Sequence, residues 1–402
     1  MGSFKQSIGL RLQKAYTALP FGWKFRLAVK NVLFTLCAPF IRNTNVFKRW
    51  QAFNNMRAPE SLPLISPGLD RVGRGEEVAE SSVLHRYVED LMRRTATAHG
   101  TDYVAMPTDI APPSACAAKA IAFYLPQFHP IAENDKWWGR GFTEWTNVSK
   151  ALPQFVGHYQ PHLPGELGFY DLRLVEVLRR QAELARTYGL HGFCFHHYWF
   201  SGYRLLERPL DMLLENPDID LPFCLCWANE NWTRRWDGQD DDVLLGQDYT
   251  ADNDLNFIRD ALPYLRDKRY IAVNGRPLLI VYRPSLLPDC KGTLETWREF
   301  CRAQGLGEIF IAMVQFDLED PRPLGFDAAL EFPPHKGARS HNPINHKLQV
   351  VNGQYSGYVV DYADLVNSSV NWPAPPYPLF KGVPPSWDNE ARKPGRGYTF
   401  PN

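Results

Sequence analysis

From residue 119 onward, short apolar runs alternate with stretches in which apolar residues recur at helical spacing. A continuous apolar run bounded by turn residues is typical of a strand buried on both faces, and apolar positions three or four apart are typical of one face of a helix. The pattern predicts strands at 120–125, 192–199, 222–227, 277–282, 309–315, 328–332 and 379–383. It predicts helices at 172–188, 205–215, 255–266 and 294–304.

Repeated strand–helix units indicate an α/β fold with a parallel sheet. The number of units and a length of about 280 residues favour a (β/α)8 barrel of the TIM type. A doubly wound sheet is the alternative. No Gly-x-Gly-x-x-Gly follows a predicted strand and no Walker loop occurs, so the sequence gives no support to a nucleotide crevice.

The residues before 119 differ in composition from the barrel region. Residues 1–57 read as a helical, amphipathic extension, and the chain before Glu60 has ten Lys and Arg and no acidic residue. Such a surface favours contact with an anionic membrane, while packing on the next domain or on a partner is the alternative. Residues 58–118 are interrupted by proline and read as a linker with one helix at 76–95. The barrel domain is then 119–402.

Overall composition limits the classes of partner. The 402 residues are 45% hydrophobic and carry no net charge, which argues against a nucleic-acid partner. The seven cysteines are scattered and fit neither a zinc site nor a disulfide framework, so we expect reduced thiols. No apolar run is long enough to span a bilayer and no signal peptide is evident. We therefore expect a cytoplasmic protein, peripheral to the inner face of the membrane through residues 1–57.

The stretch 221–237, LPFCLCWANENWTRRWD, has the most informative chemistry. An apolar run ends in a loop that holds a carboxylate, two carboxamides, three indoles and two guanidinium groups. Indoles offer flat apolar faces, amides and arginines hydrogen-bond hydroxyl groups, and a carboxylate can transfer protons. This mixture favours a sugar site.

Comparable side chains follow the other predicted strands, and the carboxyl ends of barrel strands share one edge. The loop at 137–148, WWGRGFTEWTNV, adds indoles and a glutamate, although tryptophans there could instead pack the loop onto the barrel. We predict that the following residues bind substrate: Tyr124, His129, Trp137, Trp138, Glu144, Trp145, His196, His197, Tyr198, Asn229, Asn231, Trp232, Arg234, Tyr282, His335, Trp387 and Asp388.

Glu230 and Glu331 both lie at predicted strand ends and are our candidates for an acid–base pair. The alternative is that each bonds a loop amide or pairs with an arginine. His196 and His197 are adjacent on a strand, so they point to opposite faces and cannot readily share a metal ion. We predict no metal and no cofactor.

Eight segments, in order along 122–393, resemble the WbsX-like glycosyltransferase family of lipopolysaccharide and O-antigen biosynthesis, which is similar to glycoside hydrolase family 99. They are AFYLPQFHP, WWGRGFTEWTNV, QPHLPGELGFYDL, HGFCFHHYWFSG, CWANENWTRRWDG, GRPLLIVYRP, EFPPH and FKGVPPSWDNEARK. The resemblance implies a (β/α)8 barrel, a glycan or sugar-donor substrate and a bacterial cell-surface polysaccharide pathway. It also implies that further glycosyltransferase domains or subunits accompany this one.

One element of the family pattern is absent. After the WDNEAR segment the family continues into a last strand with a Glu-Trp-x-Glu element, which bears the catalytic carboxylates in family 99, and residues 393–402 hold none. We therefore expect a barrel that is incomplete at its C-terminus, in a fragment of a longer protein or in a chain without this chemistry. The expected function is of the glycosyltransferase type, with an endo-acting hydrolase of α-linked glycans and a non-catalytic glycan-binding module as alternatives.

Overall fold

The computed structural model describes residues 76–95, 104–106, 118–234, 239–316, 319–333 and 343–400. All of them belong to one of the two units into which the chain divides, Arg74–Asn402. The predicted extension 1–57 lies outside the described residues, as does His335, and the side chain of Arg234 is not described. The proposed domain boundaries at 57 and 118 stay predictions. In the linker, helix α4 spans Glu76–Thr95, the predicted range.

A parallel sheet with strand order β1-β2-β4-β8-β9-β10-β12 forms the centre of the fold. Neighbours in the sheet also follow one another along the chain, and each pair is parallel. The strands are β1 (Ile121–Tyr124), β2 (Gly192–Phe200), β4 (Phe223–Trp227), β8 (Arg276–Val281), β9 (Phe310–Gln315), β10 (Ala328–Glu331) and β12 (Leu379–Phe380).

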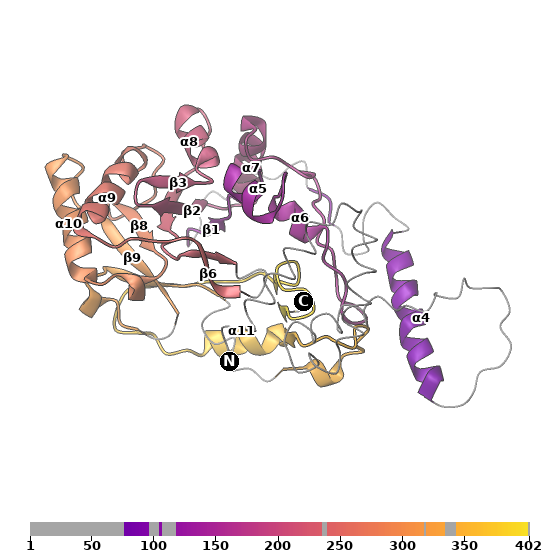
Figure 1. Ribbon diagram of the computed structural model, residues 1–402. Coiled ribbons are helices and arrows are strands. Elements are labelled where there is room, and N and C mark those ends of the chain that lie inside the picture. Colours follow the sequence, from indigo (N-terminus) through magenta and orange to yellow (C-terminus); the bar gives the residue numbers. More distant parts are fainter. Residues whose placement is uncertain are drawn as a thin grey trace, which may run out of the picture. The chain divides into compact units, whose positions relative to one another are not determined.

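Helices connect the strands of the curled sheet (Figure 1). They are α7 (Val175–Thr187), α8 (Arg208–Glu215), α9 (Ala251–Leu265), α10 (Cys290–Ala303) and α11 (Tyr362–Val370), with the shorter α5 (Ala132–Trp138) and α6 (Glu144–Val148) after β1. Among the described strands, β12 and β1 each have one neighbour in this row, so the sheet stays open between them. The prediction of an incomplete (β/α) barrel is confirmed.

All seven predicted strands are present. The helices predicted at 172–188 and 205–215 begin three residues too early, and those predicted at 255–266 and 294–304 begin four residues too late. Helix α9 starts at Ala251 because the Thr250 hydroxyl accepts a hydrogen bond from the backbone N–H of Asn253. Helix α10 starts at Cys290, where the Asp289 carboxylate accepts from Gly292 in the same way. The apolar periodicity used for prediction starts about one turn after such a cap, which explains the difference.

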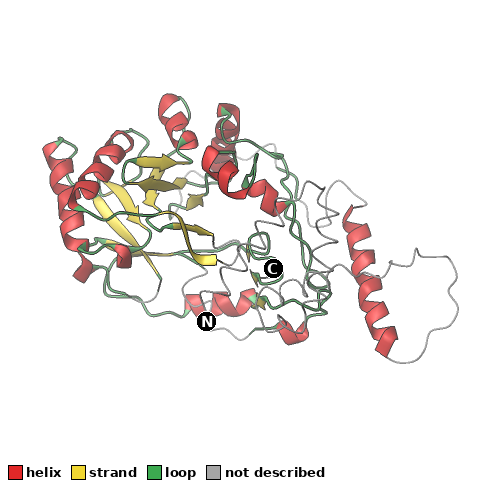
Figure 2. Cartoon of the chain, in the orientation of Figure 1, coloured by secondary structure: helices red, strands yellow, loops and turns green. Residues whose placement is uncertain are grey.

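Four smaller strand arrangements were not predicted. Strand β3 (Tyr203–Leu205) folds back on β2, and β7 (Ala272–Val273) folds back on β8. Strands β5 (Trp232–Arg234) and β6 (Gln239–Leu245) form a ribbon after β4. After β10 the chain is mostly loop (green in Figure 2), with a small sheet of β11 (Tyr358–Val359), β13 (Trp387–Asp388) and β14 (Tyr398–Phe400).

The main core lies between the sheet and its helices. Trp227 of β4 stacks on Phe257 of α9, with ring centroids 4.4 Å apart, and Trp297 of α10 packs 4.9 Å from the same phenylalanine. Strands β2 and β4 approach so closely that a Cβ on Gly192 would lie 2.1 Å from the Pro222 carbonyl oxygen. The position therefore requires glycine.

Side chains alternate between the two faces of each strand. We call the face covered by α7, α9 and α10 the outer face and the opposite one the inner face. On β2, His196 contacts the inner-face rings of Phe123 and Tyr282, whereas His197 contacts Phe257 and Tyr264 of α9. The predicted divergence of the two histidines is therefore observed.

Candidate functional site

The inner face carries a cluster of aromatic rings at the carboxyl edge of the sheet. His196 is central: its ring stacks on Phe123 at 5.6 Å, meets Tyr282 edge-on at 5.9 Å and Phe332 at 6.1 Å, and lies 6.3 Å from Tyr198. These rings come from four different strands or from the residues directly after them, so only the folded sheet brings them together.

His196 stays neutral at physiological pH. Burial lowers its pKa to about 4; the positive charge of Arg392 acts in the same direction and the negative charge of Glu230 opposes it. Its Nδ1 atom is buried and has no hydrogen-bond partner among the described residues. A neutral imidazole can donate one hydrogen bond and accept another, which suits a hydroxyl group.

Tyr198 and two tryptophans form a second ring cluster beside the first. Trp232 of β5 meets Tyr198 edge-on at 5.3 Å and Trp137 of α5 at 5.5 Å. Both indoles are partly exposed, while Tyr198 is buried. The Tyr198 hydroxyl accepts a hydrogen bond of 3.0 Å from the side-chain amide of Gln127, and burial raises its pKa to about 12. The structure thus brings three predicted residues together.

Glu230 follows β4 and is paired with Arg283, which follows β8. The Arg283 guanidinium donates to Glu230 Oε1 at 3.0 Å and lies 4.5 Å above the ring of Phe316. Both side chains of the pair are about one third exposed. Phe316 in turn meets Tyr282 edge-on at 5.3 Å, so the pair borders the inner-face rings.

Asn229 and Asn231 each hydrogen-bond the backbone of a neighbouring segment. The fully buried Asn229 side chain makes two hydrogen bonds to the backbone of Arg283. Its amide nitrogen donates to the Arg283 carbonyl oxygen at 2.9 Å, and its oxygen accepts from the Arg283 N–H at 2.7 Å. Asn231 accepts from the backbone N–H of Gln247 at 2.7 Å. Both asparagines were predicted to bind substrate, and the structure shows them holding backbone.

Glu331, the second predicted catalytic carboxylate, belongs to a different environment. It pairs in register with Gln315, whereas the inner-face positions are those of Leu330 and Val314. Its carboxylate accepts hydrogen bonds from Lys381 at 3.2 Å and from the backbone N–H of Gly382 at 3.1 Å. Glu230 therefore pairs with an arginine and Glu331 bonds a loop amide, which is the alternative considered from the sequence.

Glu144 is buried at the start of α6 and pairs with Arg392, with contacts of 2.8 and 3.2 Å. Arg392 was not predicted as a site residue, although it lies in the FKGVPPSWDNEARK segment. The positive charge of Arg392 acts to lower the pKa of both His196 and Tyr198, against the effect of burial in the case of Tyr198. The pair joins residues 248 positions apart, and no local pattern could have indicated it.

Several predicted residues lie away from the inner-face rings. Tyr124 is on the outer face, where its hydroxyl donates to Gln181 of α7 at 2.7 Å. The Trp145 indole donates to the Tyr170 carbonyl oxygen at 2.8 Å and packs its loop onto the chain, as the alternative interpretation held. Trp138 lies 6.0 Å from Phe142, which belongs to the same loop.

His129 is 2% exposed, and burial lowers its pKa to about 4. Like His196, it has a buried Nδ1 atom without a hydrogen-bond partner in the described ranges. Among the residues that the structure describes, no three histidine, cysteine or acidic side chains are placed to hold a metal ion.

Trp387 and Asp388 lie in the small sheet. Trp387 packs on the core of Val360, Leu365 and Phe400. The Asp388 carboxylate accepts hydrogen bonds from His158 at 2.8 Å and from Gln160 at 2.7 Å. Burial alone would raise the pKa of Asp388, but hydrogen bonds from His158 and His162 hold it well below its usual range. This carboxylate joins the small sheet to the loop at 154–162.

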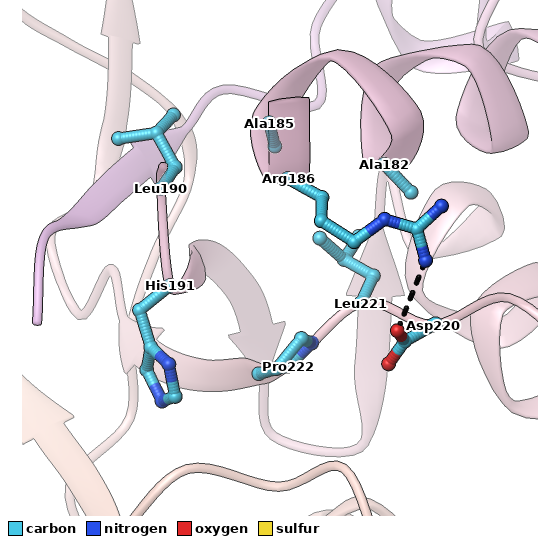
Figure 3. Close-up of a pocket in the computed structure, with 8 residues that line it drawn as sticks. All are labelled: Ala182, Ala185, Arg186, Leu190, His191, Asp220, Leu221 and Pro222. Carbon is cyan, nitrogen blue, oxygen red and sulfur yellow. Dashed lines mark hydrogen bonds and ion pairs between the residues drawn. The ribbon is translucent and has the colours of Figure 1, made fainter. Parts of the chain in front are cut away.

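A cavity of about 210 Å³ lies at the opposite edge of the sheet, next to the amino ends of β2 and β4 (Figure 3). Arg186 and Asp220 form an ion pair of 3.1 Å at its rim, and Ala182, Ala185 and Leu221 line its floor. None of the predicted site residues lines it. In α/β barrels chemistry gathers at the carboxyl edge, so we place the candidate site there.

None of the helices in the described part of the chain combines the length and apolar character that crossing a bilayer requires.

Two known proteins of Xanthomonas campestris pv. campestris, both named "Uncharacterized protein WxcX", are similar to this chain. One is 53% identical over 292 residues, which are 72% of this chain and 42% of the relative. The other is 52% identical over 289 residues, covering 72% and 41%. The chain thus spans about two fifths of the length of these relatives.

Two solved structures show weaker likeness. The endo-alpha-mannosidase of glycoside hydrolase family 99 from Bacteroides thetaiotaomicron aligns with a TM-score of 0.38 and 14% identity, over 68% of this chain and 72% of that one. A "Glycoside hydrolase-like protein" aligns with a TM-score of 0.41 and 13% identity, over 74% and 79%.

The family model "Glycosyltransferase WbsX" matches residues 120–402, which include every described strand and all loops of the carboxyl edge. The chain therefore belongs to the WbsX glycosyltransferase family and, with it, to the carbohydrate-active proteins.

Proposed function

We propose that this chain is the glycan-binding barrel of a glycosyltransferase-type protein that builds bacterial cell-surface polysaccharide, of the lipopolysaccharide or O-antigen kind. Membership of the WbsX family supports the transferase class. The ring cluster around His196 and Tyr198 is the observation on which the site assignment rests.

Sugar rings have one face of C–H groups and a rim of hydroxyls, and the site offers a partner for each. The partly exposed indoles of Trp137 and Trp232 present flat apolar surface to the C–H face. The imidazole of His196 and the carboxylate of Glu230 can hydrogen-bond hydroxyls. Because these groups come from three different loops or strands, a bound sugar would lie across the carboxyl edge.

Glu230 is the carboxylate that we propose for proton transfer or for orienting an attacking hydroxyl. It borders the ring cluster, and Arg283 fixes its orientation. Glu331 is tied to Lys381 and Gly382, so its participation would need those contacts to open. A Glu230→Gln variant should lose transfer activity in the full-length protein while keeping glycan affinity within a few fold; unchanged turnover would remove Glu230 from the mechanism.

The site assignment is tested by calorimetric titration with oligosaccharides released from X. campestris lipopolysaccharide. Trp232→Ala should weaken binding by about five- to tenfold, since the loss of one aromatic contact is worth about 1 kcal/mol. Tyr188→Ala is the matched control because Tyr188 is an exposed aromatic residue at the end of α7. Equal affinities for the two variants, or no saturable binding by the wild type, would contradict the proposal.

We also propose a cytoplasmic location with peripheral membrane contact through residues 1–57, which contain ten basic and no acidic residues. Co-sedimentation of the chain with phosphatidylglycerol vesicles should be strong at low salt and lost at high salt. Absence of co-sedimentation at low salt would contradict this part of the proposal.

A further inference from the structure

The carboxyl end of β2, which carries His196 and Tyr198, extends beyond the residues that pair with its two neighbours in the sheet. Strand β1 pairs with it only as far as Phe195, and β4 only as far as His197. The last residues of β2 pair instead with the short strand β3 through a two-residue turn, Ser201–Gly202, whose φ angles of 49° and 93° are typical of a type I′ hairpin. This end of the strand needs support from outside the parallel sheet.

The support lies on the outer face. His197 points outward, and Arg204 of β3 is the register partner of the outward Trp199. Asp260 and Tyr264 are one turn apart on α9, on the face that meets His197. Asp211 comes from α8. Two helices and two strands thus contribute to one polar cluster.

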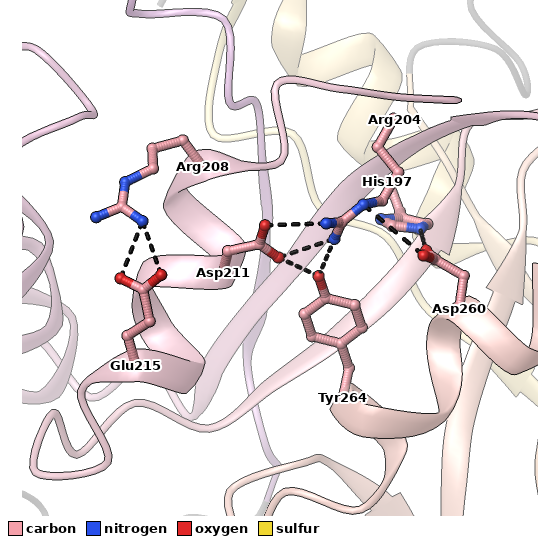
Figure 4. A network of polar contacts seen from close by, with 7 residues as sticks. All are labelled: His197, Arg204, Arg208, Asp211, Glu215, Asp260 and Tyr264. Atoms are coloured by element: carbon pink, nitrogen blue, oxygen red, sulfur yellow. Dashed lines mark hydrogen bonds and ion pairs between the residues drawn. The ribbon is translucent and has the colours of Figure 1, made fainter. Parts of the chain in front are cut away.

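Arg204 is the centre of this cluster (Figure 4). Its guanidinium donates to both oxygens of Asp211, at 2.8 and 3.1 Å, and to the Tyr264 hydroxyl, which in turn donates to Asp211. Its Nε lies 3.8 Å from Asp260 Oδ1. The other Asp260 oxygen is 3.5 Å from His197 Nε2, and neither of these two buried atoms has a hydrogen bond in the described chain.

Partly buried ion clusters of this kind contribute little net stability, because the cost of removing the charges from water offsets their attraction. They can, however, fix one arrangement of the elements that they join. Here the joined elements are α8, α9, β3 and the end of β2. His196 and Tyr198 alternate with His197 and Trp199 along the same strand and lie on its other face. Fixing the strand from the outer face therefore also fixes the positions of His196 and Tyr198 on the inner face.

We propose that Arg204, Asp211, Asp260, Tyr264 and His197 form a positioning cluster that holds the carboxyl end of β2 and so orients His196 and Tyr198 toward the glycan. This inference rests on the proposed glycan site for its affinity readout. Its effect on the orientation of His196 holds in the free chain and needs no ligand.

The test compares Arg204→Gln with Arg208→Gln in the full chain. Among the described residues, Arg208 makes only an exposed ion pair with Glu215, at 2.9 Å, and Figure 4 shows it apart from the positioning cluster. The His196 imidazole resonance is recorded by NMR with labelled histidine and assigned with His196→Gln. Arg204→Gln should shift or broaden it and weaken oligosaccharide binding by about two- to tenfold, the effect of one lost hydrogen bond. Arg208→Gln should do neither.

Different failures are distinguishable. If Arg204→Gln leaves both the His196 resonance and the affinity at the values of Arg208→Gln, with unchanged far-ultraviolet circular dichroism, the positioning role is wrong. If the wild-type chain binds no oligosaccharide, the proposed function fails, and the His196 resonance alone decides the inference. If Arg204→Gln does not fold, Tyr264→Phe, which removes a single hydroxyl, should produce the same change of the resonance at smaller size, and an unchanged resonance overturns the inference.

Discussion

Acid should destabilise this protein through His196, and a substitution should reveal how much. Burial lowers its pKa from 6.5 to about 4. Between these two values the unfolded chain binds a proton that the folded chain does not, so the free energy of unfolding falls as the pH falls from 6.5 to 4. The full difference corresponds to about 3 kcal/mol. Between pH 7 and pH 5 we expect His196 to account for a loss of about 2 kcal/mol.

The assay is urea unfolding followed by tryptophan fluorescence at pH 7 and pH 5, for the wild type and for His196→Gln. His129, whose pKa is also about 4, adds a second loss with the same sign, so the wild type should lose more than His196 alone explains. His196→Gln should reduce the loss by about 2 kcal/mol. The two proteins can differ in unfolding free energy at pH 7 without affecting the test, because only the change in unfolding free energy between pH 7 and pH 5 is compared.

His85→Gln is the matched control, because it removes an imidazole that is 75% exposed on α4. The change in unfolding free energy between pH 7 and pH 5 should be the same in this variant as in the wild type. If His196→Gln also leaves it unchanged, His196 is not held neutral by burial, and its assignment as a neutral hydrogen-bonding group of the site is refuted.

Two further substitutions test contacts at the carboxyl edge by urea unfolding. Gly382→Ala should lower the unfolding free energy by about 1–3 kcal/mol, because the added Cβ would lie 2.6 Å from the Glu331 carbonyl oxygen. Gly165→Ala is the control, because the space around Gly165 is open. Equal urea midpoints for the two variants would refute the packing argument. Arg392→Ala should lower the unfolding free energy by about 3 kcal/mol, because it leaves the buried Glu144 carboxylate without its cation. Adding Glu144→Gln should recover part of this loss. No recovery in the double variant would contradict the pairing.

The sequence predicted the fold well because its signals are local. Apolar runs such as 222–227 are long, bounded and repeated, and each became a strand of the parallel sheet. The divergence of His196 and His197 followed from strand geometry alone. The small sheet of β11, β13 and β14 was missed because its strands are two or three residues long and carry no periodic signal.

The candidate site was predicted only in outline. Position at a strand end identified Glu230 and Trp232, but the face that a side chain occupies depends on its register against neighbouring strands. Tyr124 and His197 therefore proved to lie on the outer face. The partners of the acidic residues, such as Arg392, come from segments far away in the sequence and could not be inferred from local patterns.

We propose that glycans bind at the carboxyl edge of the sheet, beside the indoles of Trp137 and Trp232. The most direct measurement is an NMR titration of the chain, with its indole nitrogens labelled, against oligosaccharides from X. campestris lipopolysaccharide. Trp297, fully buried between α10 and the sheet, serves as the internal reference. We expect saturable shifts of the Trp137 and Trp232 signals while the Trp297 signal stays in place. Saturating oligosaccharide that moves neither of the two signals would contradict the proposal.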